Sequence, residues 1–300
     1  MLDKKEGWLI HLENTSGKSG WGEVAPIEAT ELKACANILN QINSNPSRQE
    51  LEDRTSLPPK ALAFGIGAAL AELDDLIGVG SKGWLKAPTS AVLLPSHPSL
   101  LENVDCLVKA FNQKSTDALL TVKLKVGIQP RYKEEKILHQ VLKRLPENAR
   151  LRLDANGGWN RDEAKKWVSH FLEEPRLEWI EQPLPVEDLE GLLELSKQIP
   201  VALDESLIAN PSLRKNWQDW QVRRPLVEGD PRELLNELSE GIGYRVVSTA
   251  FETGIGSRWV HHLAALQQRG PTPTAPGLAP GWCPSSPLFS KDPALVWEAA

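Results

Sequence analysis

The sequence predicts an α/β protein built on a closed barrel of parallel strands. From Ala87 onward, short runs rich in β-branched residues alternate with amphipathic helical stretches. A strand-like run recurs about every 20 to 30 residues, with helical stretches between the runs, which is the pattern of parallel βα units. Seven such units are more than most open sheets contain, so we expect the sheet to close into a barrel.

Each expected strand is a short run in which apolar residues dominate. Helical stretches lie between the runs, for example at residues 131–144, 162–171 and 189–197. The seven runs are SAVLLP, TVKLKVG, LRLDAN, LEWIEQP, VALDES, WQVRRPL and YRVVSTAFE.

The first part of the chain has a different pattern. Trp8 to Leu12 and Trp21 to Val24 are predicted to be two strands joined by a turn. Helical patterns follow over residues 29–42 and 59–77. The second of these contains the run FGIGAAL, but its Gly-x-Gly lies inside a helical pattern and follows no strand. We therefore expect close helix packing there and not a dinucleotide-binding loop.

Three regions are expected along the chain. Residues 1–86 form the first region, and residues 87–270 contain the barrel. The last region, residues 271–300, is rich in proline and glycine but also contains aromatic residues. We therefore expect this tail to be an ordered segment that returns to the first region.

Composition excludes several classes of protein. The 300 residues carry a net charge of −6 and no stripe of lysine and arginine, which argues against a nucleic-acid partner. No apolar run approaches the length of a membrane span, and no signal peptide is expected at the start. The three cysteines are far apart and lack Cys-x-x-Cys spacing, so reduced structural thiols are expected. We expect a cytoplasmic protein with a small-molecule partner.

Three acidic residues stand out by their position. Asp154 follows LRL, Glu181 follows LEWI and Asp204 follows VAL. The C-terminal ends of barrel strands form the active-site face, and each of these acids is expected there. A single acid after a strand often caps the next helix. Three acids on consecutive strands would repel one another unless a cation neutralises them, and such oxygen ligands indicate Mg²⁺, with Mn²⁺ as the alternative.

The run TVKLKVG places two lysines on one face of a strand. Side chains alternate along a strand, so Lys123 and Lys125 share the face opposite the apolar residues. A solvated face of the sheet is one explanation, which would fit any antiparallel edge strand. A pair of lysines beside a divalent cation is the other, because a general base next to Mg²⁺ suits removal of a proton α to a carboxylate. Lys125 is nearer the C-terminal end of the strand and is expected to carry the proton, while Lys123 supplies charge.

Other residues have weaker patterns. The adjacent His261 and His262 lie in a predicted helix and face different directions, so a packing or surface role is expected. Trp159 follows DANGG and is expected to pack in the core. Gly254 and Gly256 precede the helix of the histidines, where their N–H groups would either bind a substrate carboxylate or form a simple turn.

Together, the motifs resemble those of the enolase superfamily, in the branch of the muconate-lactonising enzymes. The Lys-x-Lys strand, DAN, EQP and DES occur in the order and spacing of that branch, and GWGEVAP resembles the hairpin of its N-terminal capping domain. Within the branch, the chain is most similar to the o-succinylbenzoate synthases. The likeness rests on LRLDAN, in which Arg152 precedes Asp154 by two residues, and on VSTAFETGIG, which resembles the Ser-rich SSxFE segment.

This resemblance implies a modified TIM barrel, (β/α)7β, with an α+β capping domain built from the N-terminal segment and the C-terminal tail. It also implies an Mg²⁺-dependent hydro-lyase that acts on a small carboxylate. The candidate residues are Asp154, Glu181 and Asp204 as metal ligands, Lys125, Lys123 and Arg224 for catalysis, and Arg152, Ser248, Gly254 and Gly256 for substrate binding.

The chain departs from the family pattern in two places. A lysine usually precedes the proline on the sixth strand, but QVRRPL has Arg224 there. Arginine stays protonated, so it is a poor second base, although its charge can stabilise an enolate. The family's usual strand and mobile loop before the hairpin also have no counterpart, so a shortened capping domain is expected.

The arginine bears on the reaction. A syn dehydration needs one base, whereas racemases and epimerases of this branch use two. The resemblance therefore implies conversion of 2-succinyl-6-hydroxy-2,4-cyclohexadiene-1-carboxylate to 2-succinylbenzoate, in menaquinone or phylloquinone biosynthesis. An N-acylamino acid racemase or dipeptide epimerase is the alternative within the superfamily. A non-catalytic binding protein on the same barrel is the alternative of another class.

Overall fold

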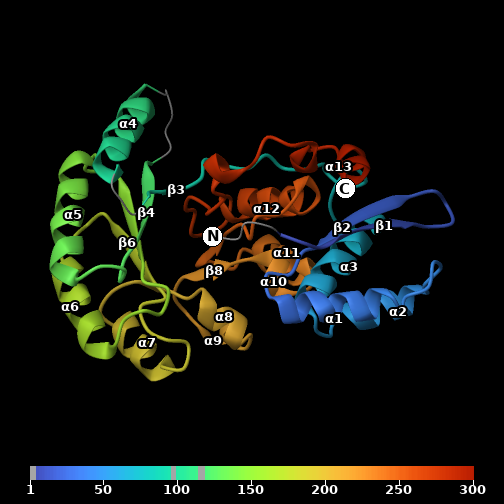
Figure 1. Cartoon of the computed structure of the whole chain (residues 1–300), viewed down its shortest axis with the longest axis horizontal. Helices are drawn as coiled ribbons and strands as arrows, with labels where there is room; N and C mark the ends of the chain where they lie inside the picture. The colour runs from blue at the N-terminus through green and yellow to red at the C-terminus, as the bar shows by residue number, and fades with distance from the viewer. Residues whose placement is uncertain (1–4, 96–98, 114–118) are drawn as a thin grey trace. The chain divides into compact units, whose positions relative to one another are not determined.

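The computed structural model describes residues 5–95, 99–113 and 119–300 (Figure 1). By their contacts, these residues divide into two compact units. Unit 2 is continuous, residues 89–222, and unit 1 combines the two segments on either side of it, residues 1–88 and 223–300. This division by contacts differs from the predicted regions along the chain, whose boundaries stay a prediction.

Unit 2 alternates strands and helices, as the βα pattern predicts. Strands β3 to β7 form one parallel sheet in sequence order. A parallel bridge between Leu203 and Gln221 continues the pairing as far as β8, whose last residue belongs to unit 1. The elements are β3 (Val92–Leu93), α4 (Leu100–Asn112), β4 (Thr121–Lys125), α5 (Arg131–Arg144), β5 (Arg150–Asp154), α6 (Arg161–Phe171), β6 (Leu177–Glu181), α7 (Leu189–Ser196), β7 (Val201–Ala202), α8 (Glu205–Ala209), α9 (Leu213–Asn216) and β8 (Gln221–Arg223).

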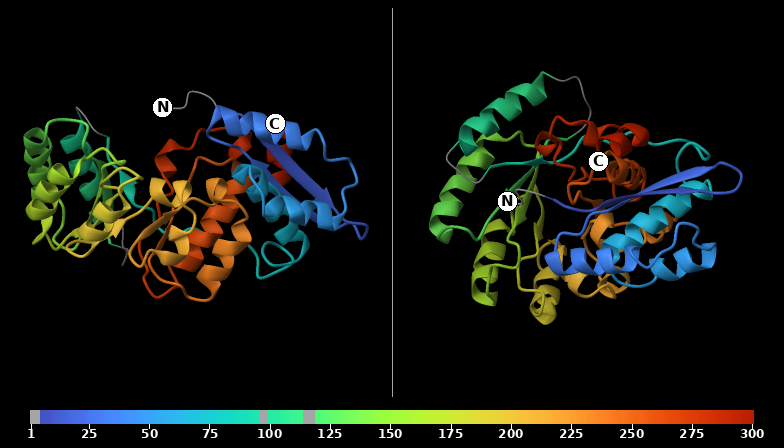
Figure 2. Two further views of the ribbon diagram at one scale, coloured as in Figure 1. Left: turned by 90° about the horizontal axis from the view of Figure 1, so that it is seen from below. Right: turned by 45° about the vertical axis from the view of Figure 1, so that its right-hand side comes forward.

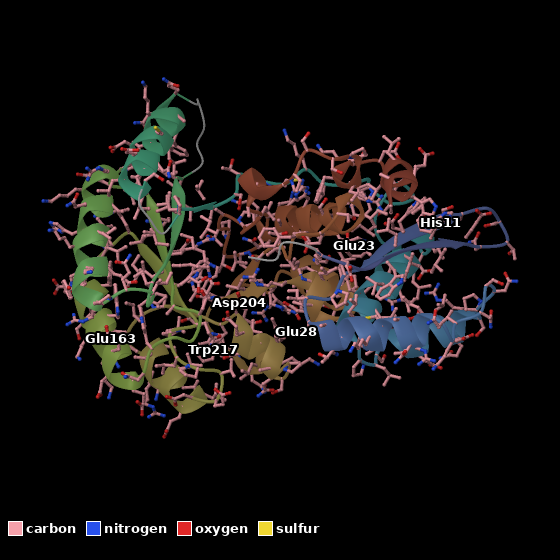
Figure 3. All side chains as sticks on the ribbon, in the orientation of Figure 1. His11, Glu23, Glu28, Glu163, Asp204 and Trp217 are labelled. Carbon is pink, nitrogen blue, oxygen red and sulfur yellow. The ribbon has the colours of Figure 1, made fainter. Side chains whose placement is uncertain are left out.

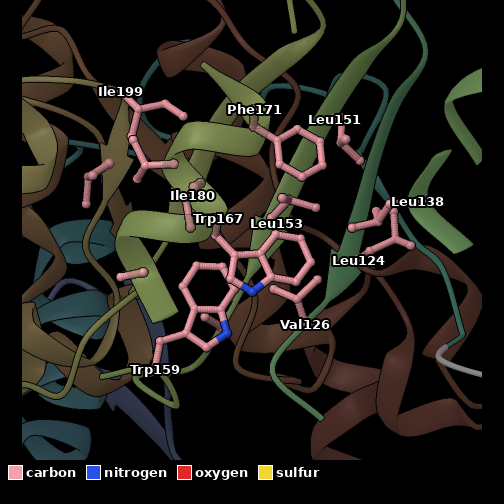
Figure 4. Close-up of a cluster of buried hydrophobic side chains, with 14 of the residues drawn as sticks. Leu124, Val126, Leu138, Leu151, Leu153, Trp159, Trp167, Phe171, Ile180 and Ile199 are labelled. Atoms are coloured by element: carbon pink, nitrogen blue, oxygen red, sulfur yellow. The ribbon is translucent and has the colours of Figure 1, made fainter. Parts of the chain in front are cut away.

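An apolar core joins this sheet to its helices. Figure 1 shows α4, α5, α6 and α7 following one another along one side of the sheet. Alternate strand residues such as Leu124, Leu151 and Leu153 are buried there, each contributing about 1.5–3 kcal/mol relative to exposure (Figure 4). Trp159 belongs to the same core and stacks on Trp167 with ring centroids 5.0 Å apart, so its predicted packing role is confirmed.

Unit 1 begins with the predicted hairpin, in which β1 (Trp8–Glu13) and β2 (Ser19–Val24) pair antiparallel. The hairpin packs against α3 (Lys60–Leu73), and Figure 2 shows the two lying side by side. A Cβ on Gly22 would lie 1.9 Å from the carbonyl oxygen of Gly65, so the approach requires glycine. The prediction that FGIGAAL serves helix packing is confirmed.

In the rest of unit 1, β9 (Arg245–Val247) pairs with β8 and contacts α12 (Gly254–Gln267). The N–H of Ser248 donates to the carbonyl oxygen of Arg223 at 2.8 Å, and Ser248 is also bridged in parallel to Gly277. In the tail, the Trp297 ring lies 5.6 Å from the ring of Trp21 in the hairpin. The remaining elements are α1 (Ala29–Leu39), α2 (Arg48–Thr55), α10 (Pro225–Glu228), α11 (Pro231–Ser239), β9 (Arg245–Val247), α12 (Gly254–Gln267), η1 (Pro280–Trp282), η2 (Pro287–Phe289) and α13 (Pro293–Ala299).

Each of the seven predicted strand runs contains one strand, from β3 to β9. The predicted α/β fold, with a parallel sheet and an N-terminal capping segment, is therefore confirmed. In the described residues the seven strands form a five-stranded and a two-stranded sheet, so closure into a barrel stays a prediction. None of the described helices has both the length and the apolar character needed to cross a membrane.

Candidate active site

Three neighbouring strands of unit 2 present charged side chains on one face. The register pairs Lys123 with Arg152, Lys125 with Asp154, and Asp154 with Glu181. Paired residues of parallel strands point to the same side, so these five side chains lie on the face opposite the core of leucines. Strand β4 is flanked by β3 and β5 and is therefore not an edge strand.

The ammonium group of Lys123 bridges two carboxylates. It lies 2.8 Å from Oδ2 of Asp154 and 2.6 Å from Oε1 of Glu181, and both acidic side chains are 2% exposed. A buried carboxylate is tolerated only where a charge or hydrogen bonds compensate it. Lys123 therefore supplies the positive charge that these two acids require.

Lys125 has a different environment. Its ammonium group lies 3.2 Å from Oδ2 of Asp154 and also donates to Oδ1 of Asn156. The Lys125 side chain is 41% exposed, against 18% for Lys123. The lysine nearer the C-terminal end of the strand is thus the more accessible one, as a role in proton transfer requires.

Asp204 follows β7 and lies directly before the first residue of α8 (Figure 3). Its side chain makes no capping hydrogen bond to that helix and is buried, so the helix-cap explanation fails for this acid. Its backbone N–H donates to Oε1 of the buried Gln182 at 3.2 Å. Burial raises the pKa of the neighbouring Glu205, and the Asp204 and Asp154 carboxylates raise it further. The carboxylates of Asp204 and Asp154 are therefore both close enough to Glu205 to affect its charge at this end of the sheet.

The predicted ligands are not arranged as a direct metal site in this structure. Within the described ranges 5–95, 99–113 and 119–300, no three Asp, Glu, His or Cys side chains are grouped closely enough to hold a metal ion. The positive charge between Asp154 and Glu181 is instead the ammonium group of Lys123.

Three polar residues of this region were missed in the sequence. Asn156, Gln182 and Glu205 each stand one or two residues after one of the three acids, inside DAN, EQP and DES. Asn156 and Gln182 have positive φ angles of 46° and 37°. Non-glycine residues rarely adopt this conformation without a specific contact. The signal available in the sequence was a polar residue within two positions after each strand-end acid.

Arg152 lies on the same face as Lys123 but is 2% exposed. Its guanidinium donates to Glu178 at 2.6 Å and lies 4.0 Å above the Trp179 ring. This arrangement combines an ion pair with a cation–π contact. Arg152 is therefore held within the wall of the site, and its predicted contact with substrate stays a prediction.

Two further candidates, Arg224 and Ser248, belong to unit 1. Nη1 of Arg224 donates to the carbonyl oxygen of Thr249 at 2.7 Å. The hydroxyl of Ser248 is buried and donates to the carbonyl oxygen of Gly277 at 3.2 Å. Both side chains are thus oriented by backbone carbonyl groups, and their predicted roles stay predictions.

The N-terminus of α12, where a substrate carboxylate was considered, already holds a carboxylate. Glu23 accepts from the N–H of Gly256 at 3.0 Å, and from the N–H and hydroxyl of Thr253 at 2.9 and 2.6 Å (Figure 3). Burial raises the pKa of Glu23. A Cβ on Gly254 would lie 1.7 Å from the carbonyl oxygen of Ser290. In this structure the two glycines therefore serve an internal anion contact and close packing.

Comparison with a protein family and with a solved structure first indicates the class of protein to which this chain is similar. Residues 108–219 match the family described as "Enolase C-terminal domain-like". A muconate-lactonizing enzyme structure has the same fold, with a TM-score of 0.69 at 19% identity over 90% of this chain and 81% of that chain. The matched segment, which carries both lysines and all three strand-end acids, is thus of the enolase type, as the motifs predict.

Two relatives that match most of this chain have the same name. The o-succinylbenzoate synthase of Thermosynechococcus vestitus is 29% identical over 278 residues, which are 88% of this chain and 82% of that protein. The enzyme of the same name from Enterobacter sp. is 26% identical over 292 residues, 92% of this chain and 83% of that protein.

A solved structure agrees with these relatives. The o-succinylbenzoate synthase from Thermosynechococcus elongatus, complexed with Mg in the active site, has a TM-score of 0.79 at 27% identity. The match covers 99% of this chain and 92% of that chain. This chain is a homologue of the o-succinylbenzoate synthases, and the resemblance predicted from its motifs is confirmed.

Proposed function

We propose that this chain is a Mg²⁺-dependent o-succinylbenzoate synthase, a hydro-lyase that converts 2-succinyl-6-hydroxy-2,4-cyclohexadiene-1-carboxylate to 2-succinylbenzoate. The observation that carries the proposal is the convergence of Lys123 and Lys125 on Asp154, with Glu181 on the next strand. Homology to enzymes of this activity over about nine-tenths of the chain supports it.

The donor chemistry of the site fits magnesium. As whole residues, backbone included, Asp154, Glu181 and Asp204 are 1%, 1% and 3% exposed. Together with Glu205, these carboxylates outnumber the two lysine ammonium groups by two, so a further cation would reduce their repulsion. Oxygen-only ligands favour Mg²⁺, with Mn²⁺ as the alternative. Held by the three acids, the metal would supply charge that stabilises an enediolate.

Lys125 performs the proton transfers in the proposed reaction. Its neutral amine takes the proton α to the substrate carboxylate, and the resulting ammonium protonates the hydroxyl that leaves as water. One C–H and one C–O bond break and one C=C bond forms, with no oxidant or reductant. Lys123 adds positive charge beside the acids, and the permanently charged Arg224 favours this one-base reaction over a two-base racemisation.

The proposal includes finer features of the fold. The strands β3 to β9 would belong to a (β/α)7β barrel over residues 87–270, capped by residues 1–86 and by the tail at 271–300. Substrate contacts would come from Arg152 and Ser248. The protein would act in the cytoplasm on a small carboxylate, without a nucleic-acid or membrane partner.

Loss of the diene absorbance tests the proposal directly. Purified protein should turn over the hydroxycyclohexadiene substrate with Mg²⁺, and chelation with EDTA should abolish the reaction reversibly. No turnover from folded protein would contradict the proposal and favour a binding protein on the same fold. Deuterium incorporation from D2O into an N-acylamino acid, without any dehydration, would favour a racemase.

A further inference from the structure

The side chain of Asn156 joins the proposed acid/base to a carboxylate on another strand end. Its Oδ1 accepts from Nζ of Lys125, and its Nδ2 donates to Oε1 of Glu205 at 2.9 Å. Its backbone N–H donates to Oδ1 of Asp154 at 3.1 Å. All of these contacts lie within unit 2. Asn156 therefore touches the lysine, a predicted metal ligand and the neighbouring acid at once.

The chemistry of these partners fixes the direction of the amide. An amide has an acceptor end and a donor end, an ammonium group can only donate, and an ionised carboxylate can only accept. Turning the amide of Asn156 around would place donor against donor at Lys125 and acceptor against acceptor at Glu205. The amide can therefore satisfy both partners in one orientation only.

The backbone at Asn156 serves the same contact. Its φ of 46° lies in the left-handed region, which asparagine tolerates better than most residues. Glu205 contributes from the other side, because its Oε1 holds the amide of Asn156 while its buried Oε2 has no hydrogen-bond partner in the described structure. The amide is thus held by its own backbone and by Glu205.

Lys125 needs such a contact more than Lys123 does. Among the described residues, Lys123 is held by two carboxylates, whereas the half-exposed Lys125 has only Asp154, at 3.2 Å, besides Asn156. A lysine side chain has a flexible four-carbon stem that samples many rotamers when it is not held. The contact with Asn156 therefore selects the rotamer in which the nitrogen lies over the strand end.

We propose that Asn156 is a positioning residue that aims the amine of Lys125 at the substrate, with Glu205 holding Asn156 in place. This inference rests on the proposed function. Loss of the contact should lower kcat more than it changes KM, because binding does not depend on the direction of the lysine. A misplacement of about 1 Å can cost on the order of 100-fold in rate.

The substitution Asn156→Gly separates the side chain from the backbone, since glycine adopts a φ of 46° without strain. We expect kcat to fall about 10- to 100-fold, KM to stay within about threefold and the melting temperature to stay unchanged. Asn156→Asp alone would set two carboxylates against each other, so it is combined with Glu205→Gln, whose amide can donate to the new carboxylate while the other oxygen accepts from Lys125. This double variant should retain more activity than the glycine variant.

Asn160 provides a matched control from the same loop. Its side chain caps α6 by accepting from the N–H of Glu163 at 2.9 Å, and it makes no hydrogen bond to a site residue within the described part of the chain. Asn160→Ala should lower the melting temperature and leave kcat unchanged. A wild-type kcat in Asn156→Gly, or a double variant no more active than the glycine variant, would overturn the positioning role. Failure of the wild type to turn over would instead overturn the proposed function.

Discussion

The ammonium group of Lys123 lies 2.6 Å from Oε1 of Glu181, whose side chain is 2% exposed. The two residues come from β4 and β6 and are joined across β5 by the carboxylate of Asp154, 2.8 Å from the same ammonium group. A lysine of the sheet thus provides a cation inside the group of acids that is proposed to bind Mg²⁺. The ion pairs of Lys123 thus link the stability of the fold to the proposed metal binding and catalysis.

The ion pairs of Lys123 with Asp154 and Glu181 predict that loss of this lysine strongly lowers the stability of the fold. Lys123→Met leaves two buried carboxylates without their shared charge, and we expect the free energy of unfolding to fall by about 3–5 kcal/mol in metal-free buffer. Mg²⁺ should restore more stability to the variant than it adds to the wild type, because it replaces the lost charge. Urea denaturation with and without Mg²⁺ measures both effects. Lys166→Met, at an exposed position of α6, is the control; equal stability of the two variants would contradict the prediction.

The two lysines should differ in their kinetic effects. Lys125→Ala should lose more than about 10³-fold in kcat, because an essential acid/base is removed. Lys123→Arg keeps its charge and should lose less, with Mg²⁺ binding retained. Steady-state rates and calorimetric titration with Mg²⁺ provide the two readouts. If Lys123→Arg were inactive while Lys125→Arg stayed active, the roles would be reversed.

Asp204 should be needed for metal binding and not for folding. Asp204→Asn removes one charged ligand, so calorimetry should show weaker Mg²⁺ binding together with loss of turnover, while the circular dichroism spectrum stays unchanged. Asp105→Asn is a suitable control, because Asp105 is 61% exposed and pairs with Arg144 on the surface. Wild-type Mg²⁺ affinity in Asp204→Asn would remove this residue from the ligand set.

His262 should make stability depend on pH. Its Nδ1 accepts from the N–H of Leu85 at 3.2 Å beside the Trp84 ring, which confirms the predicted packing role. Burial, and to a lesser extent Arg269, lower the pKa of His262 to about 4. Between pH 4 and the ordinary histidine pKa of about 6.5, the unfolded chain therefore binds a proton at His262 more readily than the folded protein does.

The contribution of His262 is fully present above pH 6.5 and is lost as the pH falls towards 4. Its size is up to about 3 kcal/mol. His262→Asn keeps an acceptor for Leu85 without a titrating group. Melting temperatures at pH 7.5 and 5 should therefore differ less in the variant than in the wild type. The same difference in both proteins would show that His262 does not titrate in this range.

The sequence by itself determined where the strands lie and which face of them is charged. Alternation along TVKLKVG separates Lys123 and Lys125 from the apolar residues, and acids at strand ends mark one edge of a parallel sheet. These features are local, since they depend on the period of a strand and on chain direction. The seven runs and the hairpin were predictable for the same reason, and the motifs were enough to indicate the family.

The tertiary structure alone decided which polar groups contact one another. Lys123 is 58 residues from Glu181 and bridges it to Asp154 only because the sheet register brings them together. The N–H of Gly256, expected as a substrate contact or a turn, binds the carboxylate of Glu23 from 233 residues away. Such pairs depend on the packing of distant segments, which no local period in the sequence records.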